Sequence, residues 1–213
     1  MVVNPKVLKI YTEIQRQLFY MIPEKWNKVY LYSSIMERQN NLETGELYFY
    51  YIPSGILKKH PVNVYEIPAK FTINENEYLR LVDKLYSKIK KLQKVCLELG
   101  EEKWESVIIS IADFQFNVEY FYEDVENFRF SSYEKHVIFR YVYLDYSIDS
   151  FNKNERDIIE KYLNVTKYYK PRTKVYSEVM YEMPFETIEI GSKNSNIQFV
   201  KEDDERLLLE EKK

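Results

Sequence analysis

The sequence has few of the residue types that build metal and nucleotide sites. Its 213 residues include one cysteine, two histidines and four glycines. The single cysteine, Cys96, excludes an internal disulfide and fits a reducing compartment. Neither His60 nor His136 stands near a carboxylate at metal-ligand spacing, and a zinc site would lack its thiolates. The glycines are isolated from one another, so no glycine-rich loop cradles a phosphate. We therefore expect no metal and no cofactor.

Long apolar runs and a strong charge of one sign are also missing. No apolar run approaches the ~18 residues that cross a membrane. The first 20 residues mix charged and apolar types, so we expect no signal peptide. The formal net charge of -3 is close to balance, which argues against a general nucleic-acid coat protein. These features predict a soluble, cytoplasmic protein with no membrane partner and no direct nucleic-acid partner.

No set of residues stands out as catalytic. A serine or cysteine nucleophile would need a histidine in a recognisable context, and none is visible. The best enzyme pattern is a D…E-x-K nuclease signature, with Asp83 upstream of Glu101 and Lys103. Glu101 falls just past the end of a predicted helix rather than on a strand, where a metal site would be rigid. We therefore predict a binding protein and not an enzyme.

Aromatic residues are abundant, at 16% of the chain with 21 tyrosines and 12 phenylalanines. Tyrosine favours strands, because its ring packs on a pleated face while its hydroxyl stays hydrated. Tyrosine is also enriched at protein interfaces. The composition therefore indicates a sheet, and it is compatible with a binding surface.

The first half of the chain passes from helical to strand periodicity. Asn4 and Pro5 are favoured at the start of a helix, and apolar residues then recur at helical spacing as far as Met21. Alternation afterwards predicts three strands. These strands are Lys28–Met36, Glu46–Ile52 and Val62–Ile67.

The second half opens with the longest predicted helix. Asn74 and Glu77 have capping-box spacing, and the helix should run to about Leu99, before Gly100. Further elements follow from alternation, cap spacing and turn residues. They are strands at Ser106–Ala112 and Phe116–Tyr122, a strand or helix end at Val137–Tyr146 opened by Ser131 and Glu134, a helix from Asn152 to Leu163, and strands at Val175–Ile190 and Ile197–Val200.

This order of elements predicts an α+β fold. Strands joined by short turns pair antiparallel, so we expect a mainly antiparallel β-sheet with helices packed on one face. The character of the chain changes after Leu163, where a basic stretch contains Pro171. We therefore expect one domain over residues 1–164. A short β-rich C-terminal extension over residues 165–213 would hold a possible hairpin and a charged, frayed end.

Two charge features could bind a partner. The first is a row of lysines at helical spacing on the longest predicted helix, which could grip phosphates or could simply be a solvated face. It consists of Lys84, Lys88, Lys91 and Lys94. On the first reading, the chain would be a nucleic-acid-binding regulatory protein, and this alternative stays open.

The second charge feature is acidic and follows the strand Phe116–Tyr122. Glu119 and Glu123 alternate away from the apolar residues of this strand, and Asp124 and Glu126 continue the charge into the next loop. A row of carboxylates interleaved with Phe121 can imitate the charge spacing of a nucleic-acid backbone. It can equally be an ordinary hydrated strand face.

Several of these segments also carry a family resemblance. In order, they are Met21–Trp26, Lys28–Tyr32, Leu47–Tyr51, Phe116–Asp124 and Phe139–Leu144. Their sequence and spacing from about residue 7 to residue 163 resemble the YezG-like immunity proteins. The residues after about 165 have no counterpart in that pattern.

The resemblance implies an antitoxin of Gram-positive bacteria. Such a protein would bind the toxic domain of a cognate secreted polymorphic toxin, often a nuclease, and would need no cofactor. Under this hypothesis the acidic residues would face a basic active-site cleft, with an aromatic side chain as anchor. The predicted partner-binding residues are Glu119, Phe121, Glu123, Asp124 and Glu126.

Overall fold

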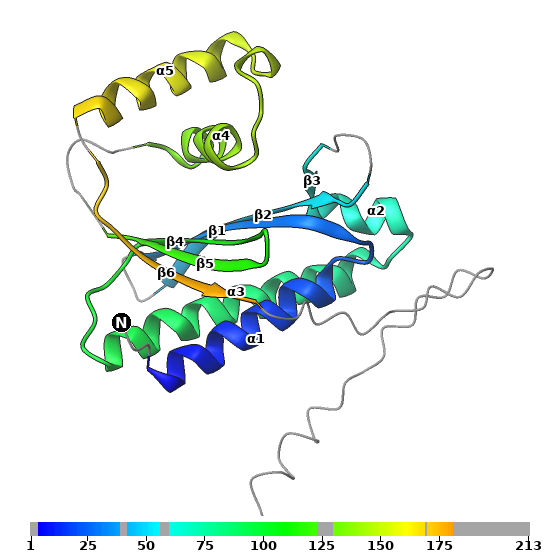
Figure 1. The fold of residues 1–213 in the computed structure, drawn as a ribbon, viewed down its shortest axis with the longest axis vertical. Coiled ribbons are helices and arrows are strands. Elements are labelled where there is room, and N and C mark those ends of the chain that lie inside the picture. The colour runs from blue at the N-terminus through cyan, green and yellow to red at the C-terminus, as the bar shows by residue number, and fades with distance from the viewer. Residues whose placement is uncertain (1–3, 39–41, 56–59, 123–129, 169, 181–213) are drawn as a thin grey trace, which may run out of the picture.

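A computed structural model describes residues 4–38, 42–55, 60–122, 130–168 and 170–180, and side chains are described outside residues 36–44. Its elements confirm the α+β class, with an antiparallel sheet between two helical layers (Figure 1). The helices are α1 (Pro5–Met21), α2 (Ile67–Phe71), α3 (Glu75–Glu98), α4 (Ser132–Tyr143) and α5 (Lys153–Tyr168). The strands are β1 (Trp26–Arg38), β2 (Leu42–Pro53), β3 (Val62–Asn63), β4 (Ser106–Ala112), β5 (Gln115–Phe121) and β6 (Thr173–Val179).

The six strands lie in the order β3-β2-β1-β4-β5-β6, and every neighbouring pair is antiparallel. Strand β1 is therefore flanked by β2 on one side and β4 on the other. Val29 pairs with Tyr51 of β2 and with Ile111 of β4, and all three side chains are buried. Alternation along each strand sends the next residues to the opposite face, so the sheet presents two different surfaces.

The two long helices share one face of the sheet, as the sequence predicted. The Asn4 side chain accepts the Lys6 N–H at 2.9 Å at the start of α1, and the Asn74 side chain accepts the Glu77 N–H at 3.1 Å at the start of α3. These caps satisfy amides that have no partner within the helix. Cys96 lies on the buried stripe of α3, as expected.

The core between these helices and the sheet is apolar, with a few polar groups satisfied inside it. The Tyr11 and Tyr120 hydroxyls lie 2.5 Å apart and join α1 to β5. Gln93 Nε2 donates to the Trp104 carbonyl oxygen at 2.6 Å. Phe116 and Val118 of β5 are also buried in this core. The predicted alternation along β5 is therefore confirmed, and Glu119 lies on the opposite face of the sheet.

The opposite face of the sheet is covered by a second helical layer. The sequence had predicted helices on one face only. The ambiguous segment Val137–Tyr146 forms most of α4, because Ser131 and Glu134 make a reciprocal capping box. Helix α4 then packs on α5, and Phe139 contacts the aromatic side chains of β1 and β2. Figure 1 shows this pair of helices on the side of the sheet away from α1 and α3.

The predicted third strand, Val62–Ile67, is wrong beyond its first two residues. Only Val62 and Asn63 pair with β2. The Asn63 side chain then accepts the Tyr65 N–H at 3.1 Å and starts a short 3-10 helix over Val64–Glu66. Asparagine competes for backbone amides in this way, so it ends the strand early.

The C-terminal part that the structure describes is joined to the sheet. Helix α5 runs across residue 164, and β6 pairs with β5 from Thr173 to Val179. The Tyr176 ring lies 4.8 Å from the Tyr11 ring, so β6 also contacts α1. We therefore propose that the folded unit extends at least to Val179. Residues 181–190 and 197–200, also predicted as strands, lie outside the described residues.

This arrangement predicts the effect of removing β6. Chains ending at Met180 and at Tyr168 both lack residues 181–213 and differ in β6. The shorter chain should melt about 10 °C lower or more, because several kcal/mol of strand pairing and packing are lost. Circular dichroism during heating measures this difference. Equal melting temperatures would show that β6 adds no stability, and the domain would then end near residue 164, as the sequence predicted.

Candidate functional site

The first predicted partner-binding residue, Glu119, contacts another part of this chain. The hydroxyl group of Tyr143 in α4 donates a hydrogen bond to Glu119 Oε2 at 3.2 Å. Burial raises the pKa of the Glu119 carboxyl, and the Tyr143 hydrogen bond partly offsets that rise. Glu119 is thus half-buried between the sheet and α4 rather than on an open strand face.

Phe121 lies on the same face of β5 and packs against the aromatic cluster that holds α4 to the sheet. Glu123, Asp124 and Glu126 lie outside the described residues. The structure therefore gives intramolecular contacts to two of the five predicted residues and leaves the acidic loop as a prediction.

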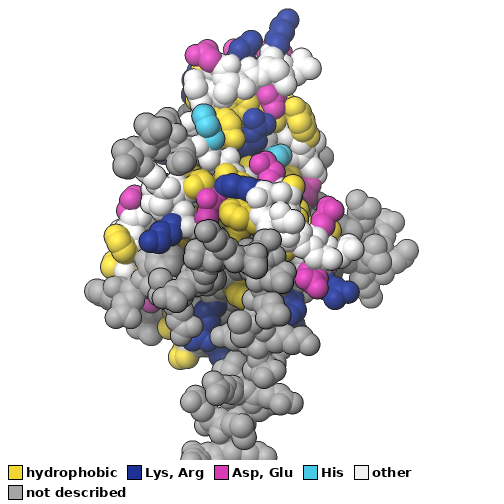
Figure 2. All heavy atoms as spheres, turned by 90° about the vertical axis from the view of Figure 1, so that its right-hand side faces the viewer, with side chains coloured by type: hydrophobic (Ala, Val, Ile, Leu, Met, Phe, Trp, Pro, Cys, Tyr) yellow, Lys and Arg dark blue, Asp and Glu magenta, His cyan; other side chains and the backbone are white. Residues whose placement is uncertain are grey.

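The predicted lysine row lies on the outer side of α3. A groove of about 390 Å³ runs between α3 and α1 and is lined by Glu13, Asp83, Lys84, Ser87, Lys88 and Lys91. Lys91 Nζ lies 3.1 Å from Glu13 Oε2. The groove thus contains carboxylates as well as lysines, and these carboxylates would repel a continuous run of phosphates. On the side of the molecule shown in Figure 2, positive and negative side chains are likewise interspersed over the described residues.

The nuclease-like pattern is not assembled into a site. Asp83 lies on α3, and Glu101 follows the end of that helix, more than ~20 Å away at 1.5 Å per residue. Glu101 instead pairs with Lys174 of β6. Within the ranges that the structure describes, no group of three or more His, Cys, Asp and Glu side chains could hold a metal ion. The described helices also include none long and apolar enough to cross a membrane.

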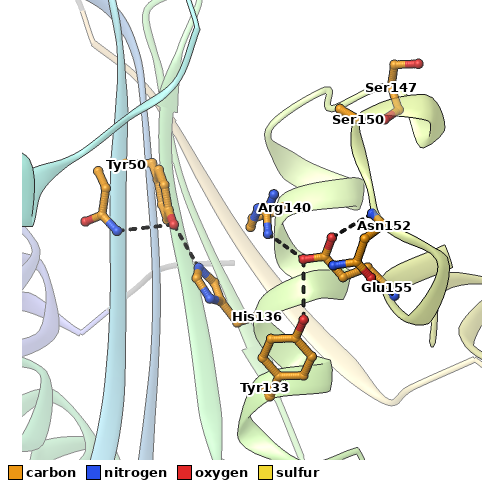
Figure 3. A network of polar contacts seen from close by, with 9 residues as sticks. Tyr50, Tyr133, His136, Arg140, Ser147, Ser150, Asn152 and Glu155 are labelled. Atoms are coloured by element: carbon orange, nitrogen blue, oxygen red, sulfur yellow. Dashed lines mark hydrogen bonds and ion pairs between the residues drawn. The ribbon is translucent and has the colours of Figure 1, made fainter. Parts of the chain in front are cut away.

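Sequence reasoning missed a polar cluster between the sheet and α4, which Figure 3 shows. Asn63 Nδ2 donates to the Tyr50 hydroxyl at 3.2 Å, and that hydroxyl lies 2.8 Å from His136 Nε2. The Tyr50 hydroxyl can donate to an unprotonated His136 Nε2 or accept from a protonated one, so the direction of this hydrogen bond follows the protonation of the ring. The His136 ring also stacks on Tyr48, with 4.4 Å between ring centroids.

The same cluster continues into α5 through a nearly buried ion pair. Arg140 Nη1 lies 3.0 Å from Glu155 Oε1, and Tyr133 donates to the same oxygen at 3.5 Å. Glu155 Oε2 also accepts the Asn152 N–H at 3.0 Å, which closes the cap of α5 (Figure 3). The cap spacing of Asn152 and Glu155 was visible in the sequence, but the ion pair with Arg140 depends on how α4 and α5 dock.

A family model described as "Immunity protein YezG-like" matches residues 7–159. These residues run from the first turn of α1 to Ile159 in the first half of α5, and they include parts of both helical layers and five of the six strands. The chain belongs to the YezG-like immunity protein family. The resemblance stated from the sequence motifs is confirmed, and family membership supports an immunity, or antitoxin, role.

Two relatives agree with the family. The chain is 27% identical over 165 residues to "Immunity protein YezG" of Bacillus spizizenii, covering 77% of this chain and 97% of that relative. It is 31% identical over 107 residues to "Type VII secretion system protein EsaG" of Staphylococcus aureus, covering 50% of this chain and 61% of that relative. The first alignment covers almost the whole of a relative that is itself an immunity protein.

The half-buried position of His136 beside Arg140 predicts a pH dependence of stability. Burial lowers the pKa of His136, and the nearby Arg140 lowers it further, while Glu155 and Glu46 oppose this shift. The unfolded chain therefore binds a proton first, from about pH 6.5 downward. The folding stability that depends on neutral His136 is therefore fully present above that pH. It is lost as the pH falls through the pKa of His136 in the folded protein.

Denaturant unfolding between pH 7.5 and pH 5 measures this effect. The parent chain should lose more stability on acidification than the His136→Asn variant, which cannot be protonated. His60→Gln, at an exposed position, is the matched control and should follow the parent. Parallel curves for the parent and His136→Asn would show that His136 does not titrate differently on folding.

Proposed function

We propose that this chain binds a cognate secreted toxin in the cytoplasm of the producing cell and neutralises it by stoichiometric occlusion. The observation that carries the proposal is the family match over residues 7–159, supported by the near-complete alignment with an immunity protein. An inhibitor of this kind needs a rigid surface with a few anchors and complementary charge. It needs no catalytic group and no cofactor.

We further propose that the toxin domain is a nuclease. A nuclease must bind phosphates, so its active-site cleft is basic, and an acidic surface can fill it. The acidic segment from Glu119 to Glu126 supplies such charge. Because Glu119 is tied to Tyr143, Glu123, Asp124 and Glu126 would make the direct contacts. Phe121 would act by holding the end of β5 against α4.

The alternative is nucleic-acid binding through the α1–α3 groove. Lys84 and Lys88 favour it, since neither makes an ion pair with any of the described residues. The carboxylates of Glu13 and Asp83 in the same groove disfavour it. A mobility-shift assay with the purified chain separates the two functions, because an immunity protein of this kind should leave nucleic acid unshifted.

Neutralisation can be tested directly. Affinity capture from the native host identifies the bound chain, whose toxic domain is then expressed alone and together with this protein. We expect growth arrest by the toxic domain alone, full rescue by co-expression, and a complex of fixed stoichiometry on size exclusion. The protein by itself should hydrolyse neither nucleic acid nor esters. Growth arrest without rescue, or metal-dependent turnover by this protein after further purification, would refute the proposal.

The acidic segment can be tested by charge reversal. Glu123→Lys with Glu126→Lys should bind the toxic domain at least about tenfold more weakly at low salt, because attraction across the interface becomes repulsion. The difference should shrink at high salt. Surface plasmon resonance at two ionic strengths measures both effects.

The matched control is Lys84→Glu with Lys88→Glu on α3, which should bind like the parent. Glu119 is left unchanged, since its reversal would disturb the contact with Tyr143. A loss of binding confined to the lysine variant would move the interface to the α1–α3 groove.

A further inference from the structure

The turn between β4 and β5 contains an unusual residue. Asp113 and Phe114 have φ angles of 51° and 59°, so both lie in the left-handed region. Two-residue hairpin turns with two positive φ angles favour Asn-Gly or Asp-Gly. Phenylalanine stands here at the position where glycine is preferred, and a bulky side chain in this region strains the backbone.

Packing offers little compensation for this strain. The Phe114 side chain is 63% exposed, the second most exposed of the large hydrophobic residues that the structure describes. The backbone of Phe114 is held in place, since its carbonyl oxygen accepts the Met180 N–H at 2.7 Å. Val179, at the end of β6, is in register with Gln115 and is 53% exposed. Phe114 and Val179 thus form an apolar corner of the sheet.

The surroundings of this corner are acidic. Asp113 and Asp145 are both exposed, and neither makes an ion pair with any of the described residues. Asp113 adjoins Phe114 in the turn, and Asp145 lies two residues beyond Tyr143, whose ring centroid is 6.5 Å from that of Tyr30 on β1. Both carboxylates add to the rise that burial causes in the pKa of Tyr30. Lys28 of β1 is in register with Ala112, the residue before Asp113. An exposed aromatic side chain with carboxylates beside it complements an apolar pocket that has a basic rim.

We propose that Phe114 is an anchor of the partner-binding surface, together with Val179 and the carboxylates of Asp113 and Asp145. This inference rests on the proposed function, and its occupant is the basic face of the toxin domain with an apolar pocket for the Phe114 ring. Strained residues that the fold does not need are characteristic of binding sites. The corner lies at the start of β5, about 24 Å from its other end. A standard interface of roughly 800 Å² per partner can therefore reach both Phe114 and the acidic segment.

The proposal predicts opposite effects of one substitution on stability and binding. Phe114→Gly should raise the melting temperature by about 2–4 °C, because it relieves the strained turn. The same variant should bind the toxin domain recovered by affinity capture about 30-fold more weakly or worse, as truncation of an anchor does. Thermal unfolding and surface plasmon resonance on the full chain measure the two effects.

Thr72→Gly is the matched control. Thr72 also has a positive φ, 55°, and is exposed at the end of α2, near the β3 edge of the sheet. Its replacement should raise the melting temperature similarly and leave binding unchanged. Val179→Lys, which keeps the turn intact, should also weaken binding. This variant decides the matter if Phe114→Gly is poorly folded.

The outcomes separate this inference from the function on which it rests. Unchanged affinity in both Phe114→Gly and Val179→Lys would overturn the anchor while leaving the immunity role intact. An equal loss of affinity in Thr72→Gly would overturn it too, since relief of strain alone would then account for the effect. A parent chain that binds no toxin domain would overturn the proposed function and this site with it.

Discussion

The alternation of side chains across β1 holds the two halves of the molecule together. Val29 and Leu31 are fully buried under α1 and α3, while Tyr30 and Tyr32 face α4. A slip of one residue in the pairing of β1 would exchange these faces and bury tyrosine hydroxyls in the apolar core. Because β1 pairs with both β2 and β4, the slip would spread across the sheet. The register of this strand therefore sets the position of both helical layers.

The two helical layers are attached to the sheet by different kinds of interaction. Apolar burial dominates on the side of α1 and α3, whereas tyrosine hydroxyls cross to α4 on the other side. Tyr48 donates to the Ser132 carbonyl oxygen, Tyr50 contacts His136, and Tyr143 donates to Glu119. Such bonds are directional, so they fix the orientation of α4 where apolar contacts alone would tolerate sliding. The many tyrosines thus hold the interface between the sheet and α4, in addition to favouring strand formation.

Local patterns were enough to predict α1, α3 and most of the sheet, because their caps and periodicity are encoded within a few residues. Val137–Tyr146 remained ambiguous, since aromatic and β-branched residues suit a strand and only the capping box indicates a helix. The contacts of Glu119 and His136 could not be predicted, because both depend on α4 docking across the sheet. The pairing of β6 with β5 joins residues about 60 positions apart, as Ser177 and Asn117 show.

Phe114 differs from the rest of the structure because its local preference and its conformation disagree. The caps of α1 and α3, the strand register and the buried stripes all favour the same fold. A natural sequence departs from such consistency mainly where function requires it. Glycine at this position would suit the turn and would expose less apolar surface. Since folding gains little from the phenylalanine ring, its presence is better explained by a partner that covers it.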